Sequence, residues 1–231
     1  MYKRQTEITR KAIAVAYEQT SGRAMFIWAD SATANQISRI WNGSSLTAPA
    51  TLTIAASGGI GEWVQLVSRP SSNELLYGVQ DAAADLNTRK WSGSTWDTAA
   101  EHPEHDGSTE NTTSMNFDLV WETHSTNPGE AWIVWGNGAN VTARHWTGTA
   151  WDPVSILSAS DDTSFIRLKA DSSSGAIFAG IYEDASAKVA NRDIWESRLT
   201  GGGSTWSAKN IIWGGPTSGT PVFFRVDIAT P

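Results

Sequence analysis

The stretch Arg89-Lys-Trp-Ser-Gly-Ser-Thr-Trp96 is one of three related stretches in this chain. The other two span Arg39–Leu46 and Arg144–Trp151, and in each an Arg stands two residues before a Trp-x-Gly sequence. A Gly just after an apolar segment favours a tight turn, so each stretch predicts a hairpin between two strands. Because the stretches recur at a spacing of about fifty residues, they indicate an internal repeat.

Five short, apolar-rich segments recur with the same spacing and are expected to form the first strand of each repeat. Turn residues such as Ser21-Gly22 or Pro128-Gly129 follow each of the first four segments. The fourth copy diverges, because it has extra residues around Gly201 and no Arg-x-Trp in register. The expected first strands are Lys11–Glu18, Gly61–Ser68, Met115–Glu122, Ser164–Asp171 and Val222–Ala229.

Each complete copy contains enough signals for four short strands. A second strand follows the first turn and ends at an Asp or Asn, which favours another turn. The third strand carries the Arg-x-Trp pair and is closed by the Gly turn. The fourth strand is expected to open at Leu46, Trp96, Trp151 or Trp206.

Four short strands per repeat, with no intervening helical pattern, exclude a βαβ architecture and predict an all-β fold. The favoured fold is a β-propeller of four four-stranded blades plus the first strand of a fifth. A blade is covered on both faces, which explains continuous apolar strands such as Trp132–Trp135. A β-sandwich is the alternative, although a sandwich gives no reason for the same Trp positions to recur at a fixed period.

The repeat sets the expected domain boundaries. Residues 1–10 are expected to lie outside the domain, and residues 1–5 are either an ordinary polar terminus or a translated remnant of a sequencing adapter. Residues 11–231 form a single repeat domain in this interpretation. Because the last segment duplicates a first strand, we expect the chain to be a piece of a longer array. The expected blades are 11–60, 61–114, 115–163 and 164–221, with a partial one at 222–231.

Composition excludes several classes of function. The chain has 24 acidic against 17 basic residues and a formal net charge of −7, so it repels phosphate backbones and nucleic acid is not an expected partner. It has no Cys, which excludes disulfides and thiol catalysis. No apolar run reaches the roughly 18 residues that a membrane-spanning helix needs.

The signature Trp-x-Gly-Ser-x-Trp stands here as Trp91–Trp96, with variants at Trp41–Leu46 and Trp146–Trp151. It resembles a family of Trp-rich repeats in large secreted or surface proteins of microbes. The resemblance covers nearly the whole chain after Arg10 and implies a propeller-like fold and an extracellular or cell-surface location. It implies no activity.

The same turn is more distantly similar to the Asp-box turn of sialidases. Gly93, Thr95 and Trp96 match the second half of that motif. Arg89 and Trp91 stand where the Asp-box has Ser and Asp, so sialidase function is not carried over.

The Arg-x-Trp pairs are the candidate ligand-binding residues. Residues i and i+2 of a strand share one face, so an Arg and an aromatic ring would lie together and hold a sugar or a carboxylate. The alternative is structural, with each Arg stacked on a Trp or bonded to backbone at a blade edge. The residues are Arg39, Trp41, Arg89, Trp91, Arg144 and Trp146.

No metal site and no cofactor are expected. His102 and His105 lie among three acidic residues in the segment 101–106, and His with carboxylates could ligate a metal. Because the other repeats have no such cluster, we interpret the segment as a solvated loop. Asp161-Asp162 and Asp106-Gly107 lack the full spacing of a calcium loop.

No catalytic residue is predicted. Glu18, Glu122 and Asp171 occupy matching ends of first strands, and a position repeated in three copies favours a structural role, because an active site is asymmetric. We therefore expect a non-enzymatic interaction or structural module of a larger extracellular protein, with glycans or surface proteins as partners. The alternative is a fragment of a propeller glycoside hydrolase whose acids line the channel.

Overall fold

The computed structural model describes residues 10–30, 33–54, 59–98, 102, 104–107, 109, 114–159, 163–183 and 192–215. The expected strand at Val222–Ala229 and the pair Asp161-Asp162 lie outside these residues. The described chain is all-β and forms four antiparallel sheets. It divides into two compact units, Met1–Ser108 and Thr109–Pro231. In the described part of the chain, no helix has the length and apolar character needed to cross a membrane.

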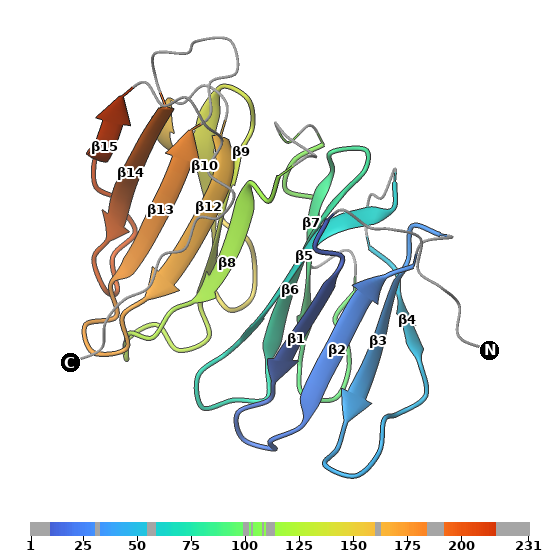
Figure 1. The fold of residues 1–231 in the computed structure, drawn as a ribbon. Coiled ribbons are helices and arrows are strands. Elements are labelled where there is room, and N and C mark those ends of the chain that lie inside the picture. Colours follow the sequence, from blue (N-terminus) through green and yellow to red (C-terminus); the bar gives the residue numbers. More distant parts are fainter. Residues whose placement is uncertain are drawn as a thin grey trace. The chain divides into compact units, whose positions relative to one another are not determined.

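The first unit contains two sheets (Figure 1). In both, consecutive strands are neighbours and pair antiparallel. Sheet 1 consists of β1 (Ile13–Tyr17), β2 (Ala24–Ala29), β3 (Gln36–Trp41) and β4 (Ala50–Leu52). Sheet 2 consists of β5 (Gly61–Ser68), β6 (Leu75–Asp81) and β7 (Leu86–Trp91).

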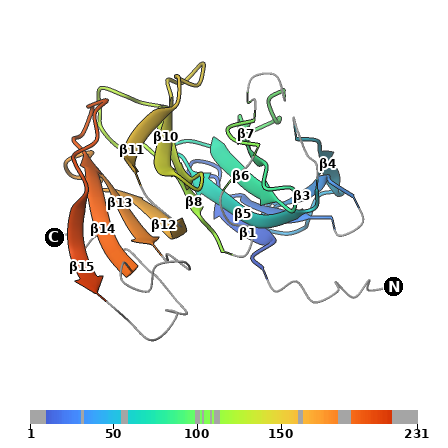
Figure 2. The ribbon, with the colours of Figure 1, turned by 90° about the horizontal axis from the view of Figure 1, so that it is seen from above.

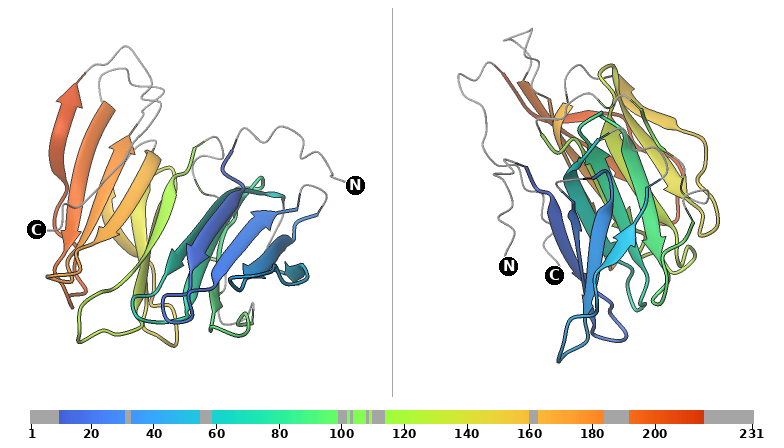
Figure 3. Two further views of the ribbon diagram at one scale, coloured as in Figure 1. Left: turned by 60° about the horizontal axis from the view of Figure 1, so that its bottom comes forward. Right: turned by 90° about the vertical axis from the view of Figure 1, so that its right-hand side faces the viewer.

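The second unit repeats this arrangement with two four-stranded sheets, whose strands lie side by side in chain order (Figure 3). Sheet 3 consists of β8 (Phe117–Trp121), β9 (Ala131–Gly136), β10 (Asn140–Trp146) and β11 (Ser155–Ala159). Sheet 4 consists of β12 (Thr163–Ala170), β13 (Ile177–Glu183), β14 (Arg192–Leu199) and β15 (Asn210–Gly215).

Within each unit the two sheets pack face to face around an apolar core. In the first unit, β1 and β2 contact β5, and small residues such as Ala14 and Ala16 of sheet 1 lie against larger ones such as Leu66 and Tyr77 of sheet 2. In the second unit, β12 contacts β8 and β9, and Ile166 and other apolar residues of sheet 4 join those of sheet 3 in one cluster (Figure 2). Within each unit this packing covers one face of each sheet.

The predicted glycine turns are present and explain why the Trp-x-Gly spacing recurs. Gly43, Gly93 and Gly148 have φ angles of 99°, 95° and 94°, a region that favours glycine. The residue before each glycine caps the turn: the side chain of Asn42, for example, accepts hydrogen bonds from the backbone N–H groups of Ser44 and Ser45.

The fourth strands correct the prediction in two respects. Leu46, Trp96, Trp151 and Trp206 do not open a strand; each forms an isolated bridge to the last residue of the third strand. In sheets 1, 3 and 4 the fourth strand begins four residues later. In sheet 2 the described residues contain three strands, and the edge of β7 is met instead by a bridge between Leu86 and Asp106.

The alignment of the second repeat is also corrected by one residue. Glu18, Glu122 and Asp171 each donate the backbone N–H that closes the first hairpin, and in sheet 2 this role belongs to Arg69, one residue beyond the predicted segment. The pairing of β5 is irregular between Gly61 and Trp63, and that of β12 is irregular at the equivalent place, between Thr163 and Phe165. Glu62 therefore matches Ser164, and the second predicted segment starts one residue too early.

Candidate functional site

The three predicted Arg residues occupy equivalent positions and share one contact. The guanidinium Nε of Arg39 donates to the carbonyl of Thr47 at 2.7 Å, and that of Arg144 donates to the carbonyl of Asp152 at 2.8 Å. Arg89 donates to the carbonyl of Asp97 through a terminal guanidinium nitrogen, while its Nε donates to the Asp97 carboxylate. Each Arg therefore ties the third strand to the segment that follows the glycine turn.

The surroundings of the three Arg residues differ strongly. Arg89 is buried, pairs with Asp97 Oδ1 at 3.0 Å and donates to the carbonyl of Thr53 in sheet 1. Arg39 and Arg144 are half-buried. Burial lowers the pKa of Arg144, against the opposing influence of the Asp152 charge.

The three Trp residues of the motif also differ in exposure. Trp41 is 37 % exposed, whereas Trp91 and Trp146 are 7 % and 3 % exposed. Trp91 packs edge-on against Trp96, with ring centroids 5.5 Å apart, and Trp146 lies at the same distance from Trp151. Of the three motif rings, only Trp41 is accessible to a ligand without rearrangement.

Sheet 1 presents Trp41 within an exposed aromatic face. Trp41 pairs with Ala24 on β2, and Ala24 pairs with Tyr17 on β1, so the three side chains share one face. Tyr17 is 62 % exposed. Two strand spacings place these aromatic residues about 10 Å apart across the small Ala24. Arg39 lies on the same face, in the neighbouring row of side chains across the strands.

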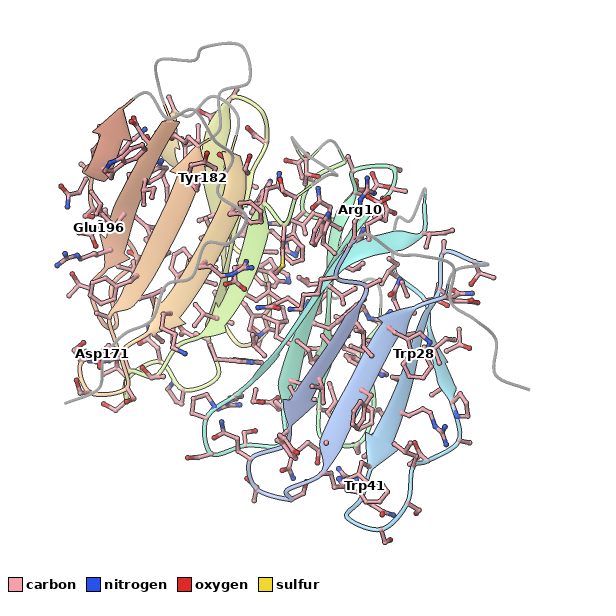
Figure 4. All side chains as sticks on the ribbon, in the orientation of Figure 1. Arg10, Trp28, Trp41, Asp171, Tyr182 and Glu196 are labelled. Atoms are coloured by element: carbon pink, nitrogen blue, oxygen red, sulfur yellow. The ribbon has the colours of Figure 1, made fainter. Side chains whose placement is uncertain are left out.

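Figure 4 places Trp41 toward one end of sheet 1 and Trp28 toward the other. Trp28 pairs with Ile13 and Ile37, so the apolar face continues along the sheet. The equivalent face of sheet 2, which carries Leu66 and Tyr77, is buried in the core of the first unit. The Arg-x-Trp pair is therefore enclosed between sheets in one copy and open in another.

A polar corner lies where sheets 1 and 2 meet at the end of β1. Glu18 is buried, and its Oε1 accepts hydrogen bonds from Trp91 Nε1 at 2.7 Å and from Arg23 at 2.9 Å. Its Oε2 accepts from Arg23 Nε at 2.7 Å and from the Ser21 hydroxyl. Arg23 also donates to the carbonyl of Gly93 at 2.6 Å. The carboxylate is fully engaged, which supports a structural role.

The equivalent corner of sheet 3 has a different composition. Glu122 follows β8, Glu130 precedes β9, and His145 lies on β10 beside both carboxylates. Trp132 donates its indole N–H to Glu122 Oε1 at 2.7 Å and stacks on the His145 ring with centroids 4.5 Å apart. Glu122 is among the residues predicted from sequence, but His145 is not, although it stands between Arg144 and Trp146 of the motif.

Sheet 4 contains a third cluster of a carboxylate, a Trp indole and a basic side chain, like those around Glu18 and Glu122. Glu183 accepts a hydrogen bond from Trp195 Nε1 at 2.6 Å and pairs with Lys209, whose Nζ is 2.9 Å from each carboxylate oxygen. Lys209 Nζ also lies 5.1 Å from the centroid of the Trp195 ring. The sequence analysis did not find this cluster, because its members are not at motif positions.

The expectation of a solvated loop around His102 and His105 is wrong for these two side chains, which are buried. The Thr88 hydroxyl lies 3.1 Å from His102 Nδ1 and 2.7 Å from His105 Nε2, and His102 Nε2 lies 2.7 Å from Asp97 Oδ2. Both ring nitrogens of His102 therefore have protein partners. The two His side chains are held against β7 by the Thr88 hydroxyl of that strand and, for His102, by the Asp97 carboxylate, which follows the glycine turn.

The matching carboxylates at first-strand ends do not share one environment. Glu18 and Glu122 are buried, but Asp171 lies in a turn where it accepts hydrogen bonds from Ser173 and Ser174. The hydrogen bond from the Ser174 hydroxyl, followed by those from Ser173, lowers the pKa of Asp171 to about 2. This is turn capping of the kind expected for an Asp at a strand end.

The chain matches no family model and no curated protein. Its sheets do superpose on solved lectins. It is similar to the BP39L lectin from Burkholderia pseudomallei with a TM-score of 0.66 and 10 % identity over 88 % of this chain and 56 % of that one. The fold is that of a β-propeller.

Two structures of the lectin from the fungus Aleuria aurantia agree with this. One, described as a six-bladed β-propeller with a novel mode of fucose recognition, has a TM-score of 0.53 and 15 % identity over 87 % of this chain and 59 % of its own. The other, a mutant in complex with Fucα1-6GlcNAc, has a TM-score of 0.56 and 14 % identity over 93 % of this chain and 65 % of its own. The chain spans less than two thirds of the length of each of these lectins.

Proposed function

We propose that this chain is a non-catalytic glycan-binding module. The observation that carries the proposal is the exposed face of sheet 1, where Trp41 and Tyr17 flank Ala24 and Arg39 lies in the neighbouring row of side chains. A sugar presents apolar C–H groups on one face and hydroxyls at its rim, so it suits an aromatic ring beside a planar donor. The propeller fold shared with lectins supports this function class.

Arg39 has the geometry of a preoriented donor. Its Nε is held by the carbonyl of Thr47, which fixes the plane of the guanidinium, and its terminal nitrogen makes only a 3.5 Å contact with the carbonyl of Leu46. Holding Nε reduces the rotamer freedom that binding would otherwise remove. We therefore place the contact at Arg39 and Trp41. The pairs Arg89–Trp91 and Arg144–Trp146 would add further sites to a multivalent scheme only after a rearrangement that exposes their buried rings.

Glycan-array binding of the full chain, with fucosylated glycans included, tests the proposal. Removing Arg39 and Trp41 together by substitution with Ala is expected to weaken binding at least about tenfold, because a charge-assisted hydrogen bond and a stacking surface are lost. The control removes Arg198 and Trp213, an Arg and a Trp on the surface of sheet 4, and should bind normally.

Each outcome of the array has a definite meaning. Binding that survives the Arg39/Trp41 double variant overturns the proposed site, and the Arg89/Trp91 double variant then tests the next pair. Absence of binding to every glycan overturns the function. Release of sugar from the array would overturn the non-catalytic part and favour the glycoside hydrolase alternative.

Three finer statements belong to the same proposal. We propose that the chain is part of a larger polypeptide, that this polypeptide is extracellular or on the cell surface, and that its repeats belong to the Trp-rich family named above. The Trp-x-Gly turns and the propeller fold support all three. The complete reading frame, with a secretion signal and neighbouring blades or without them, tests them together.

A further inference from the structure

The corner of sheet 3 brings three possible metal ligands together. His145 Nε2 lies 2.8 Å from Glu130 Oε2 and 3.6 Å from Glu122 Oε1. One ligand atom from each of the three residues lies within 4.8 Å of the other two. Each comes from a different part of the sheet: Glu122 directly follows β8, Glu130 directly precedes β9, and His145 lies near the end of β10.

Neighbouring side chains hold all three ligands in place. Asp152 Oδ2 lies 3.1 Å from His145 Nδ1, the ring nitrogen that faces away from the two Glu residues. A carboxylate on the second ring nitrogen is the usual partner of a metal-binding His, because it fixes the tautomer and the ring orientation. Asn127 donates to Glu130 Oε2 at 2.9 Å, and Trp132 donates to Glu122 Oε1.

An unsatisfied oxygen points independently to a missing ligand. Glu122 is only 4 % exposed, and within the described structure its Oε2 accepts no hydrogen bond. A buried carboxylate oxygen without a partner is costly. The matching carboxylate in sheet 1, Glu18, has hydrogen bonds to both of its oxygens.

We propose that Glu122, Glu130 and His145 form a divalent metal site of the type that binds zinc. One imidazole nitrogen and two carboxylates are a donor set that zinc accepts, with a fourth position left for water or a ligand hydroxyl. Tetrahedral ligands with bonds of about 2.0–2.1 Å lie about 3.3 Å apart, and the two separations at His145 bracket that value. Asp152 is a positioning residue, and the site clamps the β8–β9 hairpin to β10.

The test uses the full chain without a His tag, stripped with a chelator and titrated with zinc chloride by calorimetry. One zinc per chain is expected, together with a higher unfolding temperature, because a ligand that binds the folded state stabilises it. Cobalt in place of zinc should give the visible absorption of a tetrahedral site.

The variants identify the ligands. Glu122→Gln and His145→Gln should abolish binding, and Asp152→Asn should weaken it by about ten- to a hundredfold. His124→Gln is the matched control, because His124 lies in a turn and contacts Thr126. Circular dichroism establishes that each variant is folded, and Glu130→Gln provides a second ligand variant if one of the others is not.

Two results would overturn the proposal. A wild-type chain that takes up no zinc would show that His145 and the carboxylates form an ion pair only. A His145→Gln variant that binds zinc as tightly as the wild type would place the metal elsewhere, for example at His102 and His105. Neither result bears on glycan binding, which is assigned to sheet 1.

Discussion

At the scale of single residues, the Arg of the repeated Arg-x-Trp pair contributes very different amounts to stability in different copies. Arg89 is enclosed with Asp97 between two sheets, whereas Arg39 lies on an open face. Breaking a buried ion pair typically costs about 3–5 kcal/mol, and an exposed Arg contributes about 1 kcal/mol or less. Arg89→Ala should therefore lower the free energy of unfolding by about 3 kcal/mol, and Arg39→Ala by about 1 kcal/mol or less. Urea denaturation measures both, and equal losses would contradict the assigned environments.

Asp97 gives the same cluster a dependence on pH. Burial alone would raise the pKa of Asp97, but the hydrogen bond and charge of His102, with the hydrogen bonds from Arg89 and from the Lys90 backbone, lower it below its ordinary value. A group with a lowered folded pKa contributes stability above its unfolded pKa and loses it as the pH falls through the folded value.

The stability difference between the wild type and Asp97→Asn should therefore be largest near neutral pH. It should shrink once the pH drops below about 4, the unfolded value for Asp. Urea denaturation of both proteins across this range measures the difference. A difference that stays constant with pH would mean that the charge of Asp97 contributes nothing and only its shape matters.

At the scale of elements, the turns were predictable from sequence because a glycine requirement is local. Gly43→Ala and Gly93→Ala place a Cβ at φ angles near 95–99°, a strain of about 1–2 kcal/mol in each. At Gly43 the added Cβ meets nothing within 4 Å, but at Gly93 it comes within 2.9 Å of the Asn73 Cβ. Asn73 accepts hydrogen bonds from the backbone of Thr20 and Ser21, so moving it disturbs the neighbouring turn.

Gly93→Ala should consequently lose about 1–3 kcal/mol more than Gly43→Ala, the usual range for overpacking. Thermal or urea unfolding of the two variants provides the comparison. The prediction fails if the two variants are equally stable, since the extra loss depends entirely on the contact with Asn73.

Strand boundaries were predicted less completely than turns. First strands were found from their apolar runs, but an apolar run does not fix the exact residue at which a strand begins, and the second segment was placed one residue too early. The fourth strands were misplaced because Leu46 and its counterparts are apolar like strand residues, although they only close the turn.

The polar corners show the same limit for sites. His145 and Glu130 become neighbours only when β9 pairs with β10, which brings together residues fifteen positions apart. The partner of Glu18 is Trp91, which lies in another sheet, and no spacing rule connects them. Sequence alone found residues at repeated positions and missed those assembled by packing.

At the scale of the whole molecule, the repeat explains why one sheet face remains open. Ile13 and Val15 on β1 are 56 % and 52 % exposed, whereas Val64 and Leu66, in the matching strand of sheet 2, are buried under sheet 1. The matching face of sheet 2 is covered by sheet 1, whereas no sheet in the described part of the chain covers this face of sheet 1. Contiguous exposed apolar residues of this kind favour association.

We therefore expect the isolated chain to self-associate through this face as its concentration rises. Replacing Ile13 and Val15 with Lys should suppress the association, because the charges of two copies would repel and the apolar contact would be lost. The unfolding free energy should change little, since both side chains are more than half exposed. The matched variant Leu66→Lys, at the buried equivalent of Val15, should instead be strongly destabilised. Light scattering over a range of concentrations measures the mass, and a wild type that stays monomeric throughout would show that this face is not an interface between copies.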